Sequence, residues 1–214
     1  MKLRTIVVTR SGACHVKTLH TILRCNIKSM QNEGVRHEIA FVNDDPYAKS
    51  ECIENSMKTH DRIFFIDFGI QVDDKSLATV FEPNENAHIL VFPAVKDGID
   101  WKMFKDKVVN GSSEPTRQMG MHFDTNVSSC INEDYYNVTS TSAKTWLMMC
   151  KPTLKRVKCR RTGDVKIYPK SEKMFDKFRE NGVKIVAYTA ANIVITYTHE
   201  CLGNILNSAG IKSS

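Results

Sequence analysis

The stretch that decides the fold reads Asp61-Arg-Ile-Phe-Phe-Ile-Asp67-Phe-Gly69-Ile-Gln-Val-Asp73-Asp74-Lys-Ser-Leu77. Four consecutive apolar residues, Ile63 to Ile66, predict a strand buried on both faces of a parallel sheet, because a half-solvated strand would alternate. Asp67 follows where this strand ends, and Gly69 lets the chain turn. The sequence therefore places a carboxylate at the carboxyl edge of a sheet, where open α/β folds bind ligands.

A carboxylate at that edge has two interpretations. The first is a turn or cap residue, since aspartate is common where strands end. The second is a ligand for a divalent cation that binds phosphates. Beyond the turn, Asp73 or Asp74 is placed to cap a short helix over 75–80. The neighbouring segments help to decide between a turn residue and a metal ligand for Asp67.

Two more strands, each followed by a helix, precede this stretch. Continuous apolar runs predict strands over 3–9 and 38–42, and apolar residues at helical spacing predict helices over 14–32 and 47–57. Such alternation predicts a parallel sheet of right-handed βαβ units, so three strand ends share one edge. The candidate binding residues at these ends are Thr9, Arg10, Ser11, Asp44, Asp45, Asp67, Phe68 and Gly69. An edge of this kind forms a cleft of nucleotide size.

Two common phosphate-binding motifs do not occur in the sequence. No G-x-G-x-x-G follows the first strand, and no G-x-x-x-x-G-K-[ST] is present. An ordinary dinucleotide fold or P-loop kinase is disfavoured, because the phosphates would have no glycine-rich cradle. A metal ion on Asp67, together with basic side chains, would be the substitute.

The second half of the chain extends the sheet and carries further acids. Strands are predicted over 88–95, 146–149, 183–188 and 191–197, and a helix over 172–180. The polar segment 96–115 is either a lid over the sheet edge or a surface connector. A cluster of polar residues follows it and contains His122, Asp124, Asn126, Glu133 and Asp134. For His122 we expect a structural role.

Composition describes a soluble globular protein. The 214 residues are 42% hydrophobic and 25% charged, which predicts one domain, and no run approaches the roughly 18 apolar residues of a membrane span. The formal charge of +6 favours anionic partners, and the excess is concentrated in 151–161. That segment lacks the interleaved aromatic residues of a single-strand platform, so nucleic acid is the partner we expect least. Seven scattered cysteines favour reduced thiols and a cytoplasmic location.

In this order, the motifs resemble a glycosyltransferase of the GT-A fold. The strand ends at 38–45 and 61–77 are similar to those that bind uridine and metal in nucleotide-sugar transferases. Phe123-Asp-Thr-Asn-Val127 is similar to the Phe-Asn-Ser-Gly-Val segment of retaining members, and Glu133-Asp134 lies where the family often has another acidic pair. His199 with Gly203 resembles a C-terminal His-x-x-Gly metal element with one residue too many. The nearest resemblance we identify is to the N-terminal glycosyltransferase domain of a large chlorella-virus protein.

The resemblance implies a fold, a domain plan and a reaction. The fold would be an α/β GT-A (Rossmann-like) domain, with a mixed, mostly parallel sheet of about six strands flanked by helices. Residues 1–95 would bind the nucleotide and 96–214 the sugar and acceptor, with further domains following the chain. The enzyme would move a hexose or deoxyhexose from a UDP-sugar to a glycan or glycoprotein acceptor, with retention, in the cytoplasm, which would be that of the host if the protein is viral.

The resemblance also assigns residues. Asp67 and His199 would hold Mn²⁺ or Mg²⁺; Asp124, Glu133 and Asp134 would be the catalytic candidates; and Asn126 would contact the donor with the strand-end residues. In this chain, Gly69 stands where the family's Asp-x-Asp motif has its second acid, so the metal ion would need another ligand. Two alternatives stay open: a sugar nucleotidyltransferase, for which Arg10-Ser-Gly-Ala13 is at best a remnant of the Gly-rich loop, and a non-catalytic module that binds UDP or glycan.

Overall fold

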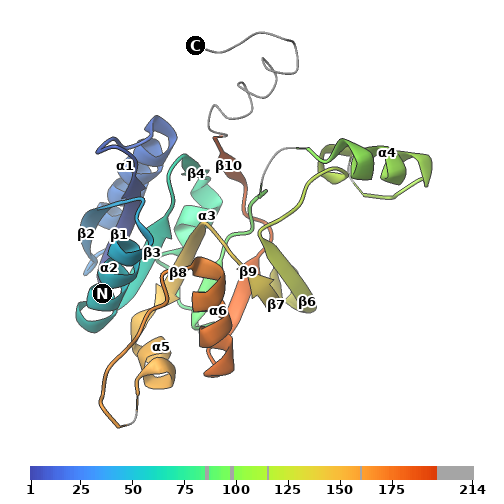
Figure 1. Cartoon of the computed structure of the whole chain (residues 1–214). Helices are drawn as coiled ribbons and strands as arrows, with labels where there is room; N and C mark the ends of the chain where they lie inside the picture. Colours follow the sequence, from blue (N-terminus) through green and yellow to red (C-terminus); the bar gives the residue numbers. More distant parts are fainter. Residues whose placement is uncertain (85–86, 97–98, 115, 160, 197–214) are drawn as a thin grey trace. The chain divides into compact units, whose positions relative to one another are not determined.

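A computed structural model describes residues 1–84, 87–96, 99–114, 116–159 and 161–196 (Figure 1). The strands are β1 (Lys2–Thr9), β2 (Arg36–Asn43), β3 (Arg62–Ile66), β4 (Ile70–Val72), β5 (Ile89–Val91), β6 (Thr125–Asn132), β7 (Tyr135–Thr141), β8 (Thr145–Met149), β9 (Ile185–Tyr188) and β10 (Ile193–Ile195). The helices are α1 (Val16–Gln31), α2 (Pro46–Thr59), α3 (Asp74–Thr79), α4 (Trp101–Val109), α5 (Cys150–Val157), α6 (Ser171–Glu180) and the 3-10 turn η1 (Thr116–Gln118).

The main sheet has eight strands in the order β2-β1-β3-β8-β5-β9-β7-β6. Six of them run in one direction, while β8 and β7 run in the other. The fold class predicted from the sequence, a mixed and mostly parallel α/β sheet, is therefore confirmed, although the sheet is larger than the six strands expected. The additional strands are β6 and β7, which form a hairpin at one edge.

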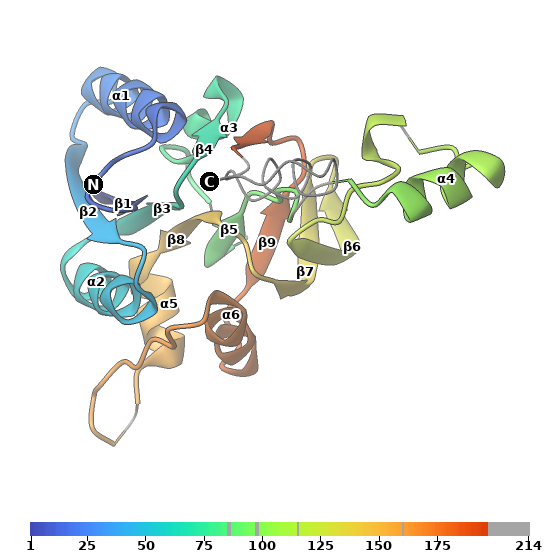
Figure 2. The same ribbon diagram turned by 45° about the horizontal axis from the view of Figure 1, so that its top comes forward.

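Helices cover both faces of this sheet. Figure 2 shows α1 and α3 on one face and α2, α5 and α6 on the other. The second face holds a continuous core in which Trp146 of β8 stacks on Phe65 of β3, with ring centroids 4.9 Å apart, and meets Phe175 of α6 edge-on. Ile53 and Met57 of α2 point into the same core, as their spacing predicted.

Local signals explain where the helices begin. Asp45 caps α2 by accepting the Ala48 N–H at 2.7 Å, and Pro46 occupies the first helical turn, where no amide donor is needed. Asp73, rather than Asp74, caps α3 by accepting the Lys75 and Ser76 N–H groups. None of the helices described is long and apolar enough to cross a bilayer.

The chain divides into two compact units. The main sheet and the helices packed on it belong to a unit formed from Met1–Ala94 and Phe123–Val194. The second unit is formed from the described residues of Val95–His122 together with Ile195 and Thr196, and it contains α4. The segment expected to be a lid or a connector thus contains a nine-residue helix, capped by Asp100, which accepts the Met103 N–H at 2.9 Å.

Candidate active site

Three neighbouring parallel strands deliver their carboxyl ends to one edge of the sheet. In the register, Thr9 of β1 lies opposite Asn43 of β2, and Val7 of β1 lies opposite Ile66 of β3. The residues that follow these strands are therefore neighbours, although more than 50 positions separate Arg10 from Asp67 in the sequence. We refer to Arg10, Asp44, Lys49, Asp67 and Phe68 as the strand-end cluster.

Asp44 is the centre of the cluster's ion pairs. Its carboxylate accepts hydrogen bonds from Arg10 Nε at 2.9 Å and from Lys49 Nζ at 2.6 Å. Burial acts to raise the pKa of Asp44, but Lys49 and Arg10 outweigh it and hold the pKa below its usual value. Asp44 is thus an anion that orients two cations at the sheet edge.

Asp67 lies in a different electrostatic setting. Its Oδ1 accepts the N–H of Phe68 at 2.8 Å, and its own N–H donates to the Lys144 carbonyl at 2.9 Å. Burial raises the pKa of Asp67, and the bond from Phe68 and the charges of Lys49 and Lys144 offset that rise only in part. Asp67 is therefore a half-buried carboxylate with cations nearby and no ion pair of its own among the described residues.

Gly69 makes the turn after β3. Its φ of +77° lies in the left-handed region, which any residue with a Cβ enters at a cost of about 1–2 kcal/mol. The position where an Asp-x-Asp motif would have its second acid is therefore the position where the chain reverses into β4. This backbone geometry is a physical reason for glycine at that position.

The turn after β1 presents Arg10. Reciprocal backbone bonds of 3.1 and 2.9 Å join Arg10 and Ala13, and both central residues, Ser11 and Gly12, have positive φ. The turn thus has two central residues and is a tight connection instead of an extended phosphate loop. The guanidinium of Arg10 stands over the ring of Phe68, which His15 contacts edge-on.

Two of the predicted binding residues are held in the scaffold by their side chains. The buried Thr9 hydroxyl donates to the Val42 carbonyl at 3.1 Å and to Asn43 Oδ1 at 3.3 Å, which fastens the end of β1 to β2. Asp45 is the cap of α2. Their neighbours Arg10, Ser11 and Asp44 are exposed, as Asp45 itself is.

Asp124 is a buried junction between three segments. Only 4% of it is exposed, and its carboxylate accepts bonds from the Ala94 N–H at 3.1 Å, the Thr125 hydroxyl at 2.8 Å and the Lys144 N–H at 3.4 Å. Thr141 extends this network through the Thr125 hydroxyl at 2.8 Å. Burial raises the pKa of Asp124, and these bonds oppose the rise. The carboxylate positions Lys144, whose carbonyl in turn holds Asp67.

Glu133 and Asp134 are not brought together with Asp124. Asp124 precedes β6, whereas Glu133 and Asp134 form the turn after it, so the eight residues of β6 separate them. At 3.3 Å per residue, that separation is on the order of 25 Å. Asn126 lies at the Asp124 end, where its side-chain amide donates to the Ser140 hydroxyl at 2.9 Å. One bound substrate atom cannot touch both ends of this hairpin.

The residues expected around a metal ion are only partly described. Of the two expected ligands, Asp67 is described and His199 lies outside the described residues. His122, for which we expected a structural role, lies in the second unit and pairs with Asp100 at 3.1 Å. Within the ranges that the structure covers, no three His, Cys, Asp or Glu side chains form a group able to hold a metal ion. One carboxylate still suits Mg²⁺ or Mn²⁺ when a diphosphate and water supply the other oxygens, and Asp67 meets that requirement.

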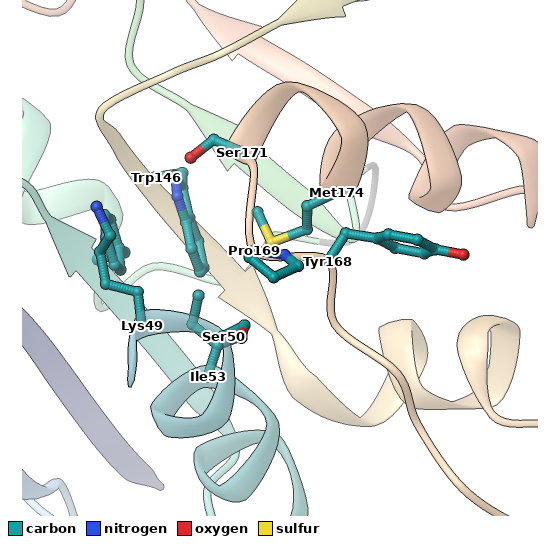
Figure 3. Close-up of a pocket in the computed structure, with 9 residues that line it drawn as sticks. Lys49, Ser50, Ile53, Trp146, Tyr168, Pro169, Ser171 and Met174 are labelled. Carbon is teal, nitrogen blue, oxygen red and sulfur yellow. The ribbon is translucent and has the colours of Figure 1, made fainter. Parts of the chain in front are cut away.

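Lys49 and Lys144 are site residues that sequence reasoning missed. Lys49 lies on the first turn of α2, close after Asp44, and this placement was the available signal. It also borders a pocket between α2 and the start of α6, which Figure 3 shows with Trp146 and Met174 in its wall. The volume of that pocket is about 10 Å³, enough for about one water molecule, so a nucleotide does not bind there.

Comparisons with known proteins support the fold. No protein-family model and no curated protein matches the sequence, so nothing supports the resemblance to a chlorella-virus protein. Among solved structures, A197 from STIV is similar with a TM-score of 0.53 at 10% identity, over 92% of this chain and 87% of that one. GalNAc-T7, crystallised with UDP, GalNAc and Mn²⁺, has a TM-score of 0.51 at 9% identity, over 100% of this chain and 45% of its own. The chain therefore has a fold similar to the GT-A fold of nucleotide-sugar transferases.

Proposed function

We propose that the protein is a metal-dependent glycosyltransferase that moves a hexose or deoxyhexose from a UDP-sugar to a glycan acceptor, with retention of configuration. The observation that carries the proposal is the strand-end cluster, where Asp44, Asp67, Arg10 and Lys49 meet at the carboxyl edge of three parallel strands. Cations and carboxylates in that arrangement suit a metal–diphosphate ligand.

Each residue of the cluster has a role in this proposal. Asp67 would hold Mn²⁺ or Mg²⁺, which, when bound, neutralises charge on the diphosphate as a Lewis acid. Lys49 and Arg10, oriented by Asp44, would contact the phosphate oxygens, and Phe68 would offer its ring to the nucleoside. Asp44, with the turn that contains Ser11, would face the uracil and ribose.

The chemistry requires one bond to break and one to form. The bond between sugar C1 and the phosphate oxygen breaks, and the acceptor oxygen bonds to C1, while its proton passes to the departing phosphate. Lys49 and Arg10 would stabilise the negative charge that grows on the leaving group, and one such contact is worth roughly 3–4 kcal/mol. Asp124 would keep Lys144 and the Asp67 turn in place.

Two observations weigh on the alternatives. The tight turn at Arg10 to Ala13 does not favour a nucleotidyltransferase, which needs an extended glycine-rich loop for a nucleoside triphosphate. The environment of Asp124 favours the second alternative, a non-catalytic module that binds UDP or glycan. Its carboxylate already accepts hydrogen bonds from Ala94, Thr125 and Lys144. A measurement of UDP-sugar turnover distinguishes the two, because only the transferase would consume the donor.

The test is thermal unfolding with UDP, GDP, ADP and NAD, each with and without Mn²⁺, followed by UDP release from UDP-sugars. A ligand at 100 times its Kd stabilises the folded state by about 2.7 kcal/mol, and we expect UDP with Mn²⁺ to raise Tm by roughly 2–4 °C. UDP release with Mn²⁺ would support the transferase. A shift without turnover would favour the binding module, and no shift with any nucleotide would contradict both.

A further inference from the structure

Helix α1 has its apolar and polar faces in an unusual arrangement. Its buried residues are mostly small and polar: Thr18, Thr21, Ile22, Cys25 and Ser29. Five of its seven exposed residues are apolar and have exposed fractions of 43% to 79%: Val16, Leu19, Leu23, Ile27 and Met30. We call these five the α1 stripe. Their spacing of three and four residues keeps them on one side of the helix, as in a helix that packs against another helix.

The α1 stripe lies on the outward face of the helix, opposite the buried residues, and the helix itself packs beside the edge strand β2. Asn26 and Ser29 of α1 contact the ring of His37 on β2, at 3.3 and 3.4 Å. Side chains alternate along a strand, so Ile39 and Phe41 lie on the same face of β2 as His37. Both are exposed, Phe41 to 58%. They are two further exposed apolar residues on the face of the sheet that carries α1.

The edge strand β2 also offers unpaired backbone groups. It is the terminal strand of the described sheet, and its even-numbered amides face β1, as the bonds from Arg36 N–H to Met1 and from Asp44 N–H to Thr9 show. The N–H and C=O groups of Ile39 and Phe41 therefore point away from the sheet. An open strand of eight residues beside apolar side chains is a template for pairing with another strand.

We propose that this surface, made of the α1 stripe and the outer edge of β2, binds a second copy of the same chain. Two β2 strands paired antiparallel about a twofold axis at Ala40 put Ile39 of one copy opposite Phe41 of the other. The backbone N–H and C=O groups of both residues point away from their own sheet, so this register forms backbone hydrogen bonds between the two copies as well as two apolar pairs. The two α1 stripes then lie on one face of the joined sheet.

The charges on α1 favour a second copy over a lipid surface. The helix carries Lys17, Arg24 and Lys28 and no acid, but Arg24 is paired with Asp74 of α3 and donates to the Val72 carbonyl, on the side away from β2. Lys17 and Lys28, seven residues before and four residues after Arg24, share its side of the helix, so like charges are kept apart when two β2 edges meet. A bilayer would leave the outward backbone groups of β2 without partners, whereas an identical strand satisfies them.

The experiment compares the full chain with two charge variants by sedimentation velocity at increasing concentration. We expect the parent to sediment as a dimer, and L23E/I27E to weaken dimerisation at least about 100-fold, because like charges would face each other in the interface. V109E is the matched control: Val109 is 75% exposed, lies on α4, and its substitution leaves the dimer intact. Circular dichroism confirms that all three proteins fold.

Hydrogen exchange supplies a second measurement. The amides of Ile39 and Phe41 should become protected as the parent dimerises and stay unprotected in L23E/I27E. A parent that is monomeric at all concentrations, or a dimer that L23E/I27E leaves unchanged, would overturn the proposal. So would a monomeric parent that sediments with phosphatidylserine vesicles through the same residues. None of these outcomes depends on whether the protein transfers sugar.

Discussion

Arg10 stands over the ring of Phe68, with its guanidinium carbon 5.0 Å from the ring centroid. Arg10 follows β1 and Phe68 follows β3, so the contact exists only because these two strands are neighbours. The same guanidinium donates to Asp44 after β2. One side chain therefore ties together the ends of three strands.

For Arg10→Ala, we expect UDP affinity with Mn²⁺ to fall about 10-fold, which corresponds to about 1.4 kcal/mol. The variant loses both a phosphate-facing cation and the contact that holds Phe68. Arg10→Lys should recover only part of the loss, because an ammonium lacks the planar fork. Titration calorimetry measures the change, with Arg36→Ala at the opposite end of β2 as a control. Unchanged affinity in Arg10→Ala would remove Arg10 from the site.

For Asp67→Asn, we expect stability to rise and activity to fall. The raised pKa means that the folded state holds the proton more tightly, so stability decreases as pH rises from about 3.9 through the folded pKa and stays lower above it. Asparagine removes this ionisation, so the gain in Tm should be present at pH 7 and absent at pH 3.

The activity of Asp67→Asn should fall about 10²–10³-fold, since the diphosphate-bound cation loses its protein ligand. UDP release from a UDP-sugar with Mn²⁺ measures this loss. Glu54→Gln, an exchange on the surface of α2, serves as the matched control. Parent-like release by Asp67→Asn would end the assignment of Asp67 as a metal ligand.

For Gly69→Ala, we expect a loss of about 1–2 kcal/mol in the free energy of unfolding, because alanine at a φ of +77° is strained. Urea titration measures the loss. Gly111→Ala, at a φ of +65° in the second unit with open space around the added methyl group, is the control for strain alone. A larger effect of Gly69→Ala than of Gly111→Ala on UDP release would place the β3–β4 turn in the site.

For Asp124→Ala, we expect the fold to lose stability first. The substitution leaves buried donors on Ala94, Thr125 and Lys144 without an acceptor, at about 1–3 kcal/mol for each unsatisfied group. Asp124→Asn should recover much of the loss, because its carbonyl oxygen can still accept. If Asp124→Asn is stable, keeps UDP affinity and yet loses turnover, Asp124 acts on the reaction directly and not through position.

Glu133→Gln with Asp134→Asn tests the far end of the β6–β7 hairpin. Neither side chain reaches Asp124, and the bond between the Asp134 carbonyl and the Thr189 N–H uses only main chain of Asp134. In a retaining reaction without a protein base, the double variant should hydrolyse the donor within about 2-fold of the parent. Loss of donor hydrolysis comparable to that of Asp67→Asn would instead return these two acids to the catalytic centre.

Much of the fold could be predicted because its signals are local. The buried strands β1, β3 and β8 are continuous apolar runs, and α6 places Met174, Phe175 and Phe178 inward at helical spacing. The hairpin of β6 and β7 escaped prediction because seven of the eight residues of β6 are exposed, so the strand lacks the alternation that reveals half-buried strands. Its existence depends on pairing with β9, which is distant in sequence.

The candidate site likewise contains residues that local sequence signals predict and contacts that they do not. Asp44 and Asp67 could be found because each follows a recognisable strand. The ion pair of Asp44 with Lys49 and the bonding of Asp124 to Ala94 and Lys144 could not, because they depend on which strands become neighbours. Periodicity predicted α1 too, but spacing alone does not say which of its faces meets the sheet.

The buried face of α1 has a consequence for how closely the helix approaches the strands beneath it. Ser29, Thr18 and Thr21 are short, and the Thr21 hydroxyl accepts the N–H of Val72 in β4 at 3.0 Å, so the backbones of α1 and β4 are separated by little more than one short side chain. A larger and more apolar residue at Ser29, which contacts His37, would push α1 away from β2. In this helix, greater hydrophobicity on the inner face would make a less stable protein.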